Sequence, residues 1–298
     1  MALPIVRSGA LIPPLAPRLP SPTSEYDQQY MGQLLGVLRL YFNTIDNFDQ
    51  SLINSTGGAY MRFPYGAFHQ DGTTYLTAPM TTTSTTDIQV ISTADFINTA
   101  GVILIVDELV TYTGKTSTTF TGITRGAYGS TKSIHATGGI VTEAQGVPNA
   151  TTALPIAMSA TDASNSVYLD PLNTARLTFD TSGYYNLQFS AQLINYTTDN
   201  DNISFWWRQN GVDIPYSAGV QQVLPKHGSF PGAAIVAWNM VTPINAGDYV
   251  ELYYASSTGN TVLCTHAPGT ILVAPPVTPT SPAVITTATF VSALPAVP

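Results

Sequence analysis

The side chains that most often perform catalysis or bind metal ions are few and dispersed in this chain. Its four histidines form no H-x-x-H or H-E-x-x-H pattern, and its one cysteine belongs to no Cys/His pair of ligand type. Neither a G-x-S-x-G nor a G-x-x-x-x-G-K-[ST] sequence is present. We therefore expect no enzyme activity, no metal site and no cofactor. The residues in question are His69, His135, His227, His266 and Cys264.

Carboxylates offer only two places where acid–base chemistry or calcium binding could be considered. Asp107 and Glu108 would point to opposite faces of a strand, so they could not flank one bond, and a solvated or arginine-paired role is the better interpretation. The stretch 199–202 carries oxygen ligands suited to calcium, but a polar loop between strands explains it more simply. The glycines between 122 and 129 fit hairpin turns better than a phosphate-binding loop.

Composition narrows the class of protein further. Only 9% of the 298 residues are charged, against roughly 25% in an ordinary soluble domain. With 10 basic and 18 acidic residues and a net charge of −8, the chain lacks the clustered Lys and Arg that nucleic-acid binding requires. No apolar run approaches the ~20 residues of a membrane span. We expect a folded protein that neither binds nucleic acid nor inserts into a membrane.

Residues 1–23 form a Pro-rich segment that cannot build a core of its own. Its prolines favour extended polyproline geometry and remove backbone donors. We expect this arm to lie in a groove on another protein or on a neighbouring subunit, with a frayed terminus as the alternative. The apolar residues that would anchor it are Ile5, Val6, Leu11, Ile12, Leu15 and Leu19.

The segment 24–56 contains the one strong helix pattern, at about 24–54. Apolar residues recur there at alternating spacings of three and four, which is a heptad seam, and Ser24 and Asp27 have the spacing of a capping box. A short trimeric coiled coil and an ordinary amphipathic helix both fit the pattern. The seam residues are Met31, Leu34, Leu38, Tyr41, Ile45, Phe48 and Leu52.

The remainder of the chain shows alternating, Thr- and Val-rich runs typical of β-strands. A first block, 81–147, includes the runs 87–92, 101–114, 118–130 and 139–144, and predicts a small barrel or sandwich. A second block, 148–298, has longer strands that predict a two-sheet sandwich or jelly roll. The predicted strands of the second block are 176–180, 184–195, 202–211, 233–244, 248–256 and 284–291.

Aromatic residues occur as adjacent pairs on three of these predicted strands. One ring of each pair must face inward and the other outward. An outward ring could pack at a subunit interface or stack against a sugar, and we favour the interface. The residues predicted to form the core and interface are Tyr184, Tyr185, Phe189, Phe205, Trp206, Trp207, Trp238, Tyr249, Tyr253 and Tyr254.

Three stretches of the second block resemble the complement-globular-head and tumour-necrosis-factor-like jelly roll found in bacteriophage structural proteins. They are FDTSGYYNLQFSAQL (179–193), ISFWWRQNGVDIP (203–215) and GDYVELYYAS (247–256), and SPAVITTATF (281–290) is similar to the closing strand of that family. The resemblance covers about residues 150–291. It implies a tight homotrimer whose aromatic strands pack about a three-fold axis.

The first block is similar to a small β module of phage tail and fibre proteins. The pattern stands here as Glu108, Tyr112–Gly114 and Thr124–Gly126, followed by His135 and Gly138. Because residues 64–78 resemble the first strand of the jelly roll, the module is expected to be inserted after that strand. The Pro-rich arm and Tyr-rich helix likewise resemble the virion-attached ends of proteins from marine, T7-like podoviruses.

Together these patterns predict a mainly β protein: a trimeric jelly-roll β-sandwich with an inserted small β domain, preceded by an extended arm and one α-helix. The expected parts are 1–23, 24–56, 57–80 plus 148–298, and 81–147. The resemblance implies a virion protein, made in the bacterial cytoplasm, that is anchored to other virion proteins by its arm and takes part in attachment to a host glycan or protein. The alternatives are a decoration protein of capsid or tail without host contact, and a glycan-binding, lectin-like module.

Overall fold

The computed structural model describes residues 15–21, 24–53, 63–96, 99–147, 150–266 and 279–294, without the side chains of 50–53. The chain divides into two compact units, Met1–Phe63 and Pro64–Pro298. As predicted, the protein is mainly β: the described residues form one α-helix in the first unit and antiparallel sheets in the second. No helix of the described part is long and apolar enough to span a membrane.

Helix α1 (Gln28–Ile53) begins four residues later than the pattern 24–54 predicted. The cause is the cap: the carboxylate of Asp27 accepts a hydrogen bond from the Gln29 amide at 2.8 Å, and the Asp27 carbonyl accepts one from Met31. Asp27 is therefore the residue before the first turn, and Ser24 lies outside the helix.

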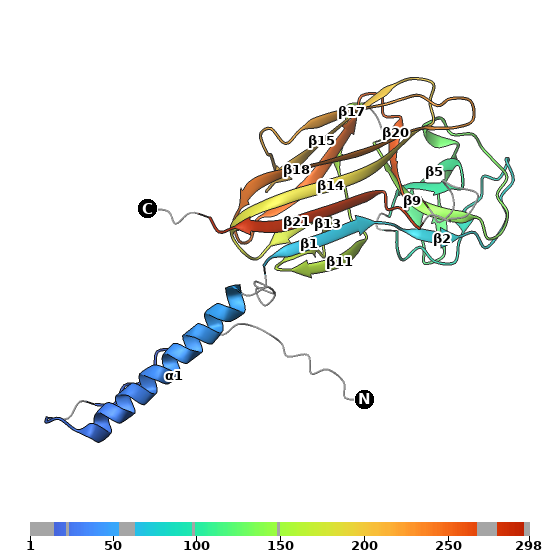
Figure 1. Cartoon of the computed structure of the whole chain (residues 1–298). Coiled ribbons are helices and arrows are strands. Elements are labelled where there is room, and N and C mark those ends of the chain that lie inside the picture. Colours follow the sequence, from blue (N-terminus) through green and yellow to red (C-terminus); the bar gives the residue numbers. More distant parts are fainter. Residues whose placement is uncertain are drawn as a thin grey trace. The chain divides into compact units, whose positions relative to one another are not determined.

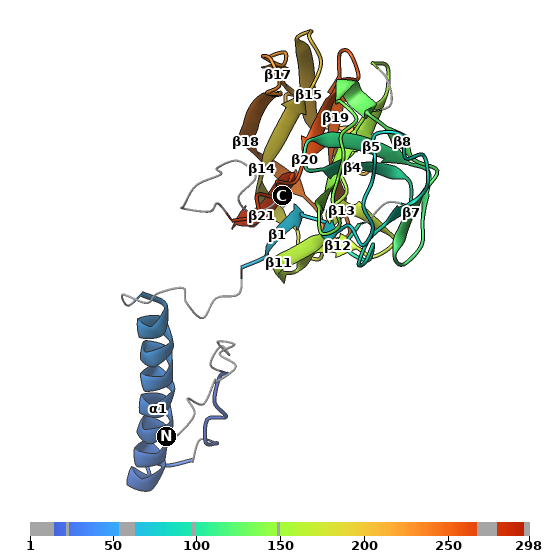
Figure 2. The same ribbon diagram turned by 90° about the vertical axis from the view of Figure 1, so that its right-hand side faces the viewer.

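Two sheet layers form the sandwich of the second unit (Figures 1 and 2). The first layer has the order β11 (Ala160–Asn165), β1 (Tyr65–Gln70), β21 (Val284–Ser292), β14 (Gly183–Asn195) and β18 (Gly232–Ile244). The second has the order β12 (Val167–Asp170), β13 (Asn173–Phe179), β19 (Tyr249–Ser256), β15 (Asp201–Gln209), with β16 (Val212–Asp213), β17 (Gly219–Val223) and β10 (Ala153–Pro155) paired at its margins.

Aromatic rings fill the space between the two layers. Phe189 on β14 lies 4.5 Å from Trp238 and 5.2 Å from Phe205, measured between ring centroids. Each adjacent aromatic pair sends one ring inward, as predicted: Tyr185, Trp207 and Tyr254 are buried, while Tyr184, Trp206 and Tyr253 are half-buried on outer faces. Because side chains alternate along a strand, one ring of each pair contributes to the core and the other lies on the outer face of its sheet.

The block 81–147 forms a smaller β module beside the sandwich (Figure 1). Its strands continue the first layer, because β20 (Thr261–Cys264) pairs with β14 on one side and with β9 on the other. The module strands are β9 (Ile140–Gly146), β4 (Gly101–Ile105), β5 (Glu108–Tyr112) and β8 (Thr124–Arg125), with β3 (Ile88–Gln89), β7 (Thr119–Thr121) and β6 (Gly114–Lys115) in a separate small sheet and a 3₁₀ turn at Ala127–Gly129.

Two local expectations differ from the structure. Asp107 and Glu108, considered above as neighbours on one strand, lie instead at the turn of the hairpin β4–β5, because Val106 adopts a left-handed conformation (φ 57°) and turns the chain with Asp107. The segment 64–78, treated as one strand of the sandwich, holds β1 and then β2 (Thr73–Tyr75), which pairs with β9 of the module. The chain therefore enters the module before residue 80.

A small apolar cluster joins the module to the sandwich. Module residues of β4, β5 and β9 pack in it against Ile194 of β14 and against Val262 and Cys264 of β20. Burial raises the pKa of the Cys264 thiol, as befits a small core residue rather than a nucleophile. The buried module members of this shared cluster are Val102, Leu104, Leu109 and Ala144.

Candidate functional sites

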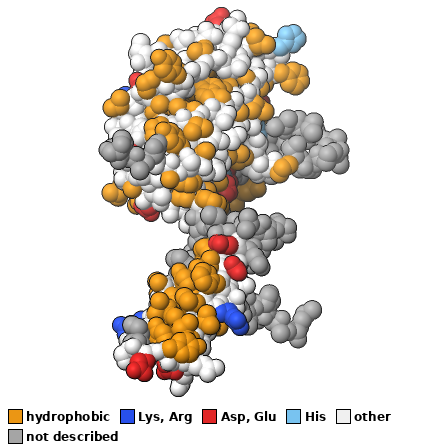
Figure 3. All heavy atoms as spheres, turned by 60° about the vertical axis from the view of Figure 1, so that its left-hand side comes forward, with side chains coloured by type: hydrophobic (Ala, Val, Ile, Leu, Met, Phe, Trp, Pro, Cys, Tyr) orange, Lys and Arg blue, Asp and Glu red, His pale blue; other side chains and the backbone are white. Residues whose placement is uncertain are grey.

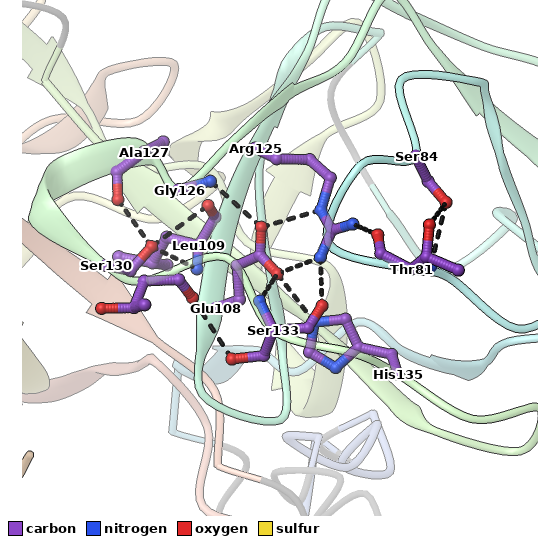
Figure 4. A network of polar contacts seen from close by, with 11 residues as sticks. Thr81, Ser84, Glu108, Leu109, Arg125, Gly126, Ala127, Ser130, Ser133 and His135 are labelled. Atoms are coloured by element: carbon purple, nitrogen blue, oxygen red, sulfur yellow. Dashed lines mark hydrogen bonds and ion pairs between the residues drawn. The ribbon is translucent and has the colours of Figure 1, made fainter.

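A buried carboxylate organises the module (Figure 4). Glu108 accepts hydrogen bonds from Arg125 Nε at 2.9 Å and Nη2 at 2.5 Å, from the amides of Gly126 at 3.1 Å and Ser133 at 3.0 Å, and contacts His135 Nε2 at 2.8 Å. The side chains of Glu108, Arg125 and His135 are each at most 2% exposed. This cluster, the Glu108 network, confirms the arginine-paired role expected for Glu108.

The hairpin and a glycine turn bring the network together. Glu108 opens β5 directly after the turn at Val106, and β8 pairs with β5 so that Arg125 lies beside it. Gly126 follows with φ 66°, which points its amide at the carboxylate, and Arg125 also donates to the carbonyls of Thr81 and Ser133. Every charged group of the network is satisfied by protein and closed to solvent, an arrangement suited to stabilising the module.

A second buried carboxylate, Asp201, fixes the start of β15. It accepts hydrogen bonds from the hydroxyls of Ser256 (2.6 Å) and Ser257 (3.0 Å) and from the amides of Thr258 (3.1 Å) and Thr261 (3.0 Å). These donors occupy the oxygens that calcium would need. Only Asp199 and Asn200 lie in the loop expected at 199–202, because Asp201 and Asn202 already belong to β15. No group of three or more His, Cys, Asp or Glu within the described ranges is arranged to hold a metal ion.

Both carboxylates have a pKa below the ordinary value. Burial, the largest influence, acts to raise the pKa of Glu108, but the hydrogen bonds from Arg125, Ser133 and His135 and the Arg125 charge outweigh it. The same balance between burial and the Ser256, Thr261 and Ser257 donors lowers the pKa of Asp201.

Acid is therefore expected to destabilise the second unit. A carboxyl whose pKa is lowered in the folded state stabilises fully above its unfolded value, here 4.5 for Glu108 and 3.8 for Asp201, and loses that contribution as pH falls through the folded value. Urea midpoints at about pH 7 and about pH 3 measure the effect. The midpoint should fall at the lower pH, and by less in Glu108→Gln. Equal midpoints at both pH values would contradict the assignment.

The outer face of the second layer carries a row of alternating charges across four strands. Arg176 on β13 pairs with Glu251 on β19 at 3.2 Å, Glu251 lies opposite Arg208 on β15, and Arg208 pairs with Asp213 on β16 at 2.7 Å. The exposed fractions of these side chains are 36%, 5%, 30% and 63% in that order. The row is thus open to solvent at its Arg176 and Asp213 ends.

Aromatic rings flank this row. Trp206 lies opposite Tyr253 with ring centroids 5.8 Å apart, and the Trp206 indole donates to Asp213 Oδ1 at 2.8 Å. The guanidinium of Arg208 lies 4.6 Å from the centre of the Tyr253 ring, and that of Arg176 lies 4.1 Å from the Tyr249 ring. We call the seven residues the aromatic–charge band: Arg176, Trp206, Arg208, Asp213, Tyr249, Glu251 and Tyr253.

Sequence reasoning found the three aromatic members of this band but missed its four charged ones. The available signal was Asn210-Gly211, which takes positive φ at both residues and makes a two-residue hairpin turn. Such a turn sets Gln209, the last residue of β15, opposite Val212, the first residue of β16. The next pair outward is Arg208 and Asp213, so these two could have been paired from sequence alone.

The outer face of three strands of the first layer is the opposite in character. Strands β14, β18 and β21 contain no Asp, Glu, Lys, Arg or His anywhere along their length. Their outward side chains are small, amide or apolar, and Ile235 (67% exposed), Val241 (54%) and Val291 (55%) are open to solvent. We call this surface the uncharged face.

The first unit presents a helix that is apolar over much of its circumference. Of the predicted seam, Leu34, Leu38, Tyr41, Ile45 and Phe48 are half-buried and Met31 is 36% exposed, while the side chain of Leu52 lies outside the description. Leu35 and Phe42 are exposed beside the seam, and Leu40 is exposed on another side of the helix. Figure 3 shows apolar side chains running along α1.

The described part of the arm lies along the same helix. Leu15 and Pro17 line a shallow pocket with Val37, Leu40 and Tyr41. Leu15 and Leu19 remain 87% and 54% exposed. The other four predicted anchor residues, Ile5, Val6, Leu11 and Ile12, lie outside the described residues.

Two hollows lie where the module meets the sandwich. One, of about 320 Å³, is lined by residues of β4, β9, β10 and β13, and the other, of about 480 Å³, includes Asp107, Tyr196 and His266. Burial lowers the pKa of His266 and is the first cause that raises that of Tyr196. Neither hollow brings together a nucleophile, a base and an orienting group, so neither has the geometry of a hydrolytic site.

The fold and these surfaces define the class of the molecule as a mainly β protein with a sandwich, a sheet-continuous β module and an apolar N-terminal helix. No family model and no curated protein matches the chain.

Proposed function

We propose that this protein is a structural component of a bacteriophage virion, a homotrimer anchored to the particle by its N-terminal arm and helix, whose sandwich faces outward and takes part in host attachment. The phage class comes from the motifs at 101–141, 179–193, 203–215 and 247–256. The observation that carries the assembly is the uncharged face, which suits burial against copies of the same chain.

The arrangement of strands supports a jelly roll of the resembled family. From β13 onward the chain crosses repeatedly between layers: β13, β15, β17 and β19 lie in one layer, and β14, β18 and β21 in the other. Crossing between layers at nearly every connection is the pattern of Greek-key sandwiches.

Trimer formation gives a physical reason for the uncharged face. A surface without charged side chains has little to lose by desolvation, and its exposed Ile235, Val241 and Val291 gain by leaving water. Amides such as Asn186 and Asn239, which already bond each other at 3.0 Å, can be covered without leaving a buried charge. Interface cores are depleted of charge in the same way.

Helix α1 adds a second self-association surface. Apolar residues on the seam and beside it, including Leu35 (58% exposed) and Phe42 (58% exposed), cover more of the helix than the arm segment 15–21 can bury. Three parallel copies would bury this surface in a coiled coil wide enough for the rings of Tyr41 and Phe48. The helix thus favours the same symmetry as the uncharged face.

Light scattering coupled to size exclusion tests the assembly with the full chain. We expect a particle of three 31.7 kDa subunits. The double variant Ile235→Asp/Val241→Asp should shift the mass towards monomer, because it places six carboxylates in the trimer interface. Val212→Asp, equally exposed but on β16, is the matched control and should remain trimeric. A wild-type monomer, or a double variant that stays trimeric, would overturn the assembly.

Particle experiments separate attachment from decoration. Removing residues 1–23 should abolish incorporation into virions under both functions. Antibodies against the sandwich should lower adsorption to cells and label a few sites at the tail if the protein serves attachment. Labelling over the whole shell with unchanged adsorption would overturn the attachment role.

A further inference from the structure

We infer that the aromatic–charge band binds a neutral pyranose residue of a polysaccharide. The inference rests on the proposed function for its biological setting, since it names the chemistry of the host partner, but the site itself stands on the geometry of one chain. Its centre is the part of the band around Trp206, Tyr253, Arg208 and Asp213.

The first requirement of a sugar site is an apolar platform. Trp206 and Tyr253 lie side by side on neighbouring strands, with centroids 5.8 Å apart and planes inclined by 33°. Both rings belong to the outward face, and their buried neighbours Trp207 and Tyr254 fill the core instead. The Trp206 indole N–H already donates to Asp213, and the Arg208 guanidinium lies over the Tyr253 ring. The C–H face of a pyranose would therefore cover the remaining ring surface, chiefly that of Trp206.

The second requirement is a small set of polar groups fixed beside the platform. Asp213 is 63% exposed, and both Arg208 and the Trp206 indole use its Oδ1, so that Oδ2 keeps its capacity to accept from a sugar hydroxyl. Arg208, held between Asp213 and the Tyr253 ring, places a fork of donors at the same edge. Adjacent hydroxyls of a pyranose need this combination of acceptor and donor.

The site is held in place before any ligand arrives. Strand pairing sets Trp206 opposite Tyr253, and the hairpin turn at Asn210-Gly211 sets Arg208 opposite Asp213. Stacking, an ion pair and a hydrogen bond then fix the four side chains to one another. Binding therefore costs little side-chain ordering, which is the usual requirement for affinity at a shallow site.

Charge selects a neutral ligand over an anionic one. The row Arg176, Glu251, Arg208 and Asp213 contains two positive and two negative groups, and each arginine already has a carboxylate partner. A uronic acid or a sialic acid would have to displace Asp213 or Glu251 from its arginine, against a chain of net charge −8. A neutral hexose or N-acetylhexosamine meets no such penalty.

The location of the band also leaves it accessible in the assembly. It lies on the second layer, whereas the uncharged face that we assign to the trimer lies on the first. Covering one face with copies of the chain leaves the other open, so each trimer would present three bands. Weak single sites repeated three times can hold a repetitive polysaccharide through avidity.

Saturation-transfer NMR on the full chain tests the inference, with the methyl pyranosides of glucose, galactose, mannose and N-acetylglucosamine as neutral probes and methyl glucuronide as the anionic probe. We expect transfer to at least one neutral probe. Trp206→Ala and Asp213→Asn should each weaken that binding by about tenfold or more. Tyr168→Ala removes an exposed aromatic ring (41%) from β12 of the same layer and should bind as wild type.

The outcomes separate this inference from the proposed function. No transfer to any neutral probe, transfer to methyl glucuronide alone, or binding that survives both Trp206→Ala and Asp213→Asn would overturn the sugar site while leaving the trimer intact. Sugar binding by a protein of monomeric mass would support the site and contradict the proposed assembly. Near-ultraviolet circular dichroism of each variant verifies that loss of binding is not loss of the fold.

Discussion

Glu108→Gln is expected to lower the free energy of unfolding of the second unit by about 3–5 kcal/mol. The substitution removes the negative charge that faces Arg125 and His135 in a site closed to water. Glutamine has a single acceptor oxygen, so it can accept from the amide of Gly126 or from that of Ser133 but not from both, and it cannot balance the buried guanidinium. Urea unfolding followed by circular dichroism measures the change, and hydrogen exchange of the β5, β8 and β9 amides locates it in the module.

Two further variants sharpen this prediction. Asp107→Asn, one residue away in the exposed turn, removes the same charge and should change stability by no more than about 0.5 kcal/mol. Adding Arg125→Met to Glu108→Gln should recover part of the loss, because the uncompensated charge is then gone. If Glu108→Gln were as mild as Asp107→Asn, the network would not stabilise the module.

Phe189→Ala, in the core of the sandwich, should lower the free energy of unfolding by about 3–5 kcal/mol. The ring is 1% exposed and lies against Phe205, Trp207 and Trp238. These partners come from both layers, so the space left by the ring cannot close without moving one sheet towards the other. Tryptophan fluorescence reports the transition directly, because all three tryptophans of the chain lie in this unit.

The control for Phe189→Ala is Gln188→Ala. Gln188 is the preceding residue of β14 and points outward, where it is exposed. Its replacement should change the unfolding midpoint little. A loss of similar size in both variants would mean that the effect comes from the strand backbone rather than from the aromatic core.

Much of the β architecture follows from local patterns. Alternation required one ring of each adjacent aromatic pair to face inward, and this needed only the period of a strand. The structure shows the inward rings to be those of Tyr185, Trp207 and Tyr254. The hairpin at Val106 could not be predicted in the same way. Val106 is β-branched in a left-handed conformation, and the turn carries no glycine, proline or asparagine, so that Asp107-Glu108 is the only interruption of the apolar run.

The candidate sites depend on contacts that sequence separation hides. Glu108 contacts Arg125, Ser133 and His135, which lie 17, 25 and 27 residues further along the chain. A sequence motif can contain these residues without indicating that they bind the same carboxylate. The sequence separation is larger still in the aromatic–charge band, where Arg176 and Glu251 are 75 residues apart. Only the pairing of β13 with β19 makes them neighbours.

The shared apolar cluster between module and sandwich has a consequence for how this protein can change over generations. A module that was connected to the sandwich only through its two linkers could be exchanged between proteins as a unit. Here Val102 and Leu104 pack with Ile194, Val262 and Cys264, and β9 continues the sheet through β20. A transplanted module would have to match both a hydrogen-bonding edge and a packing surface, so the two parts must be inherited, and diversify, together.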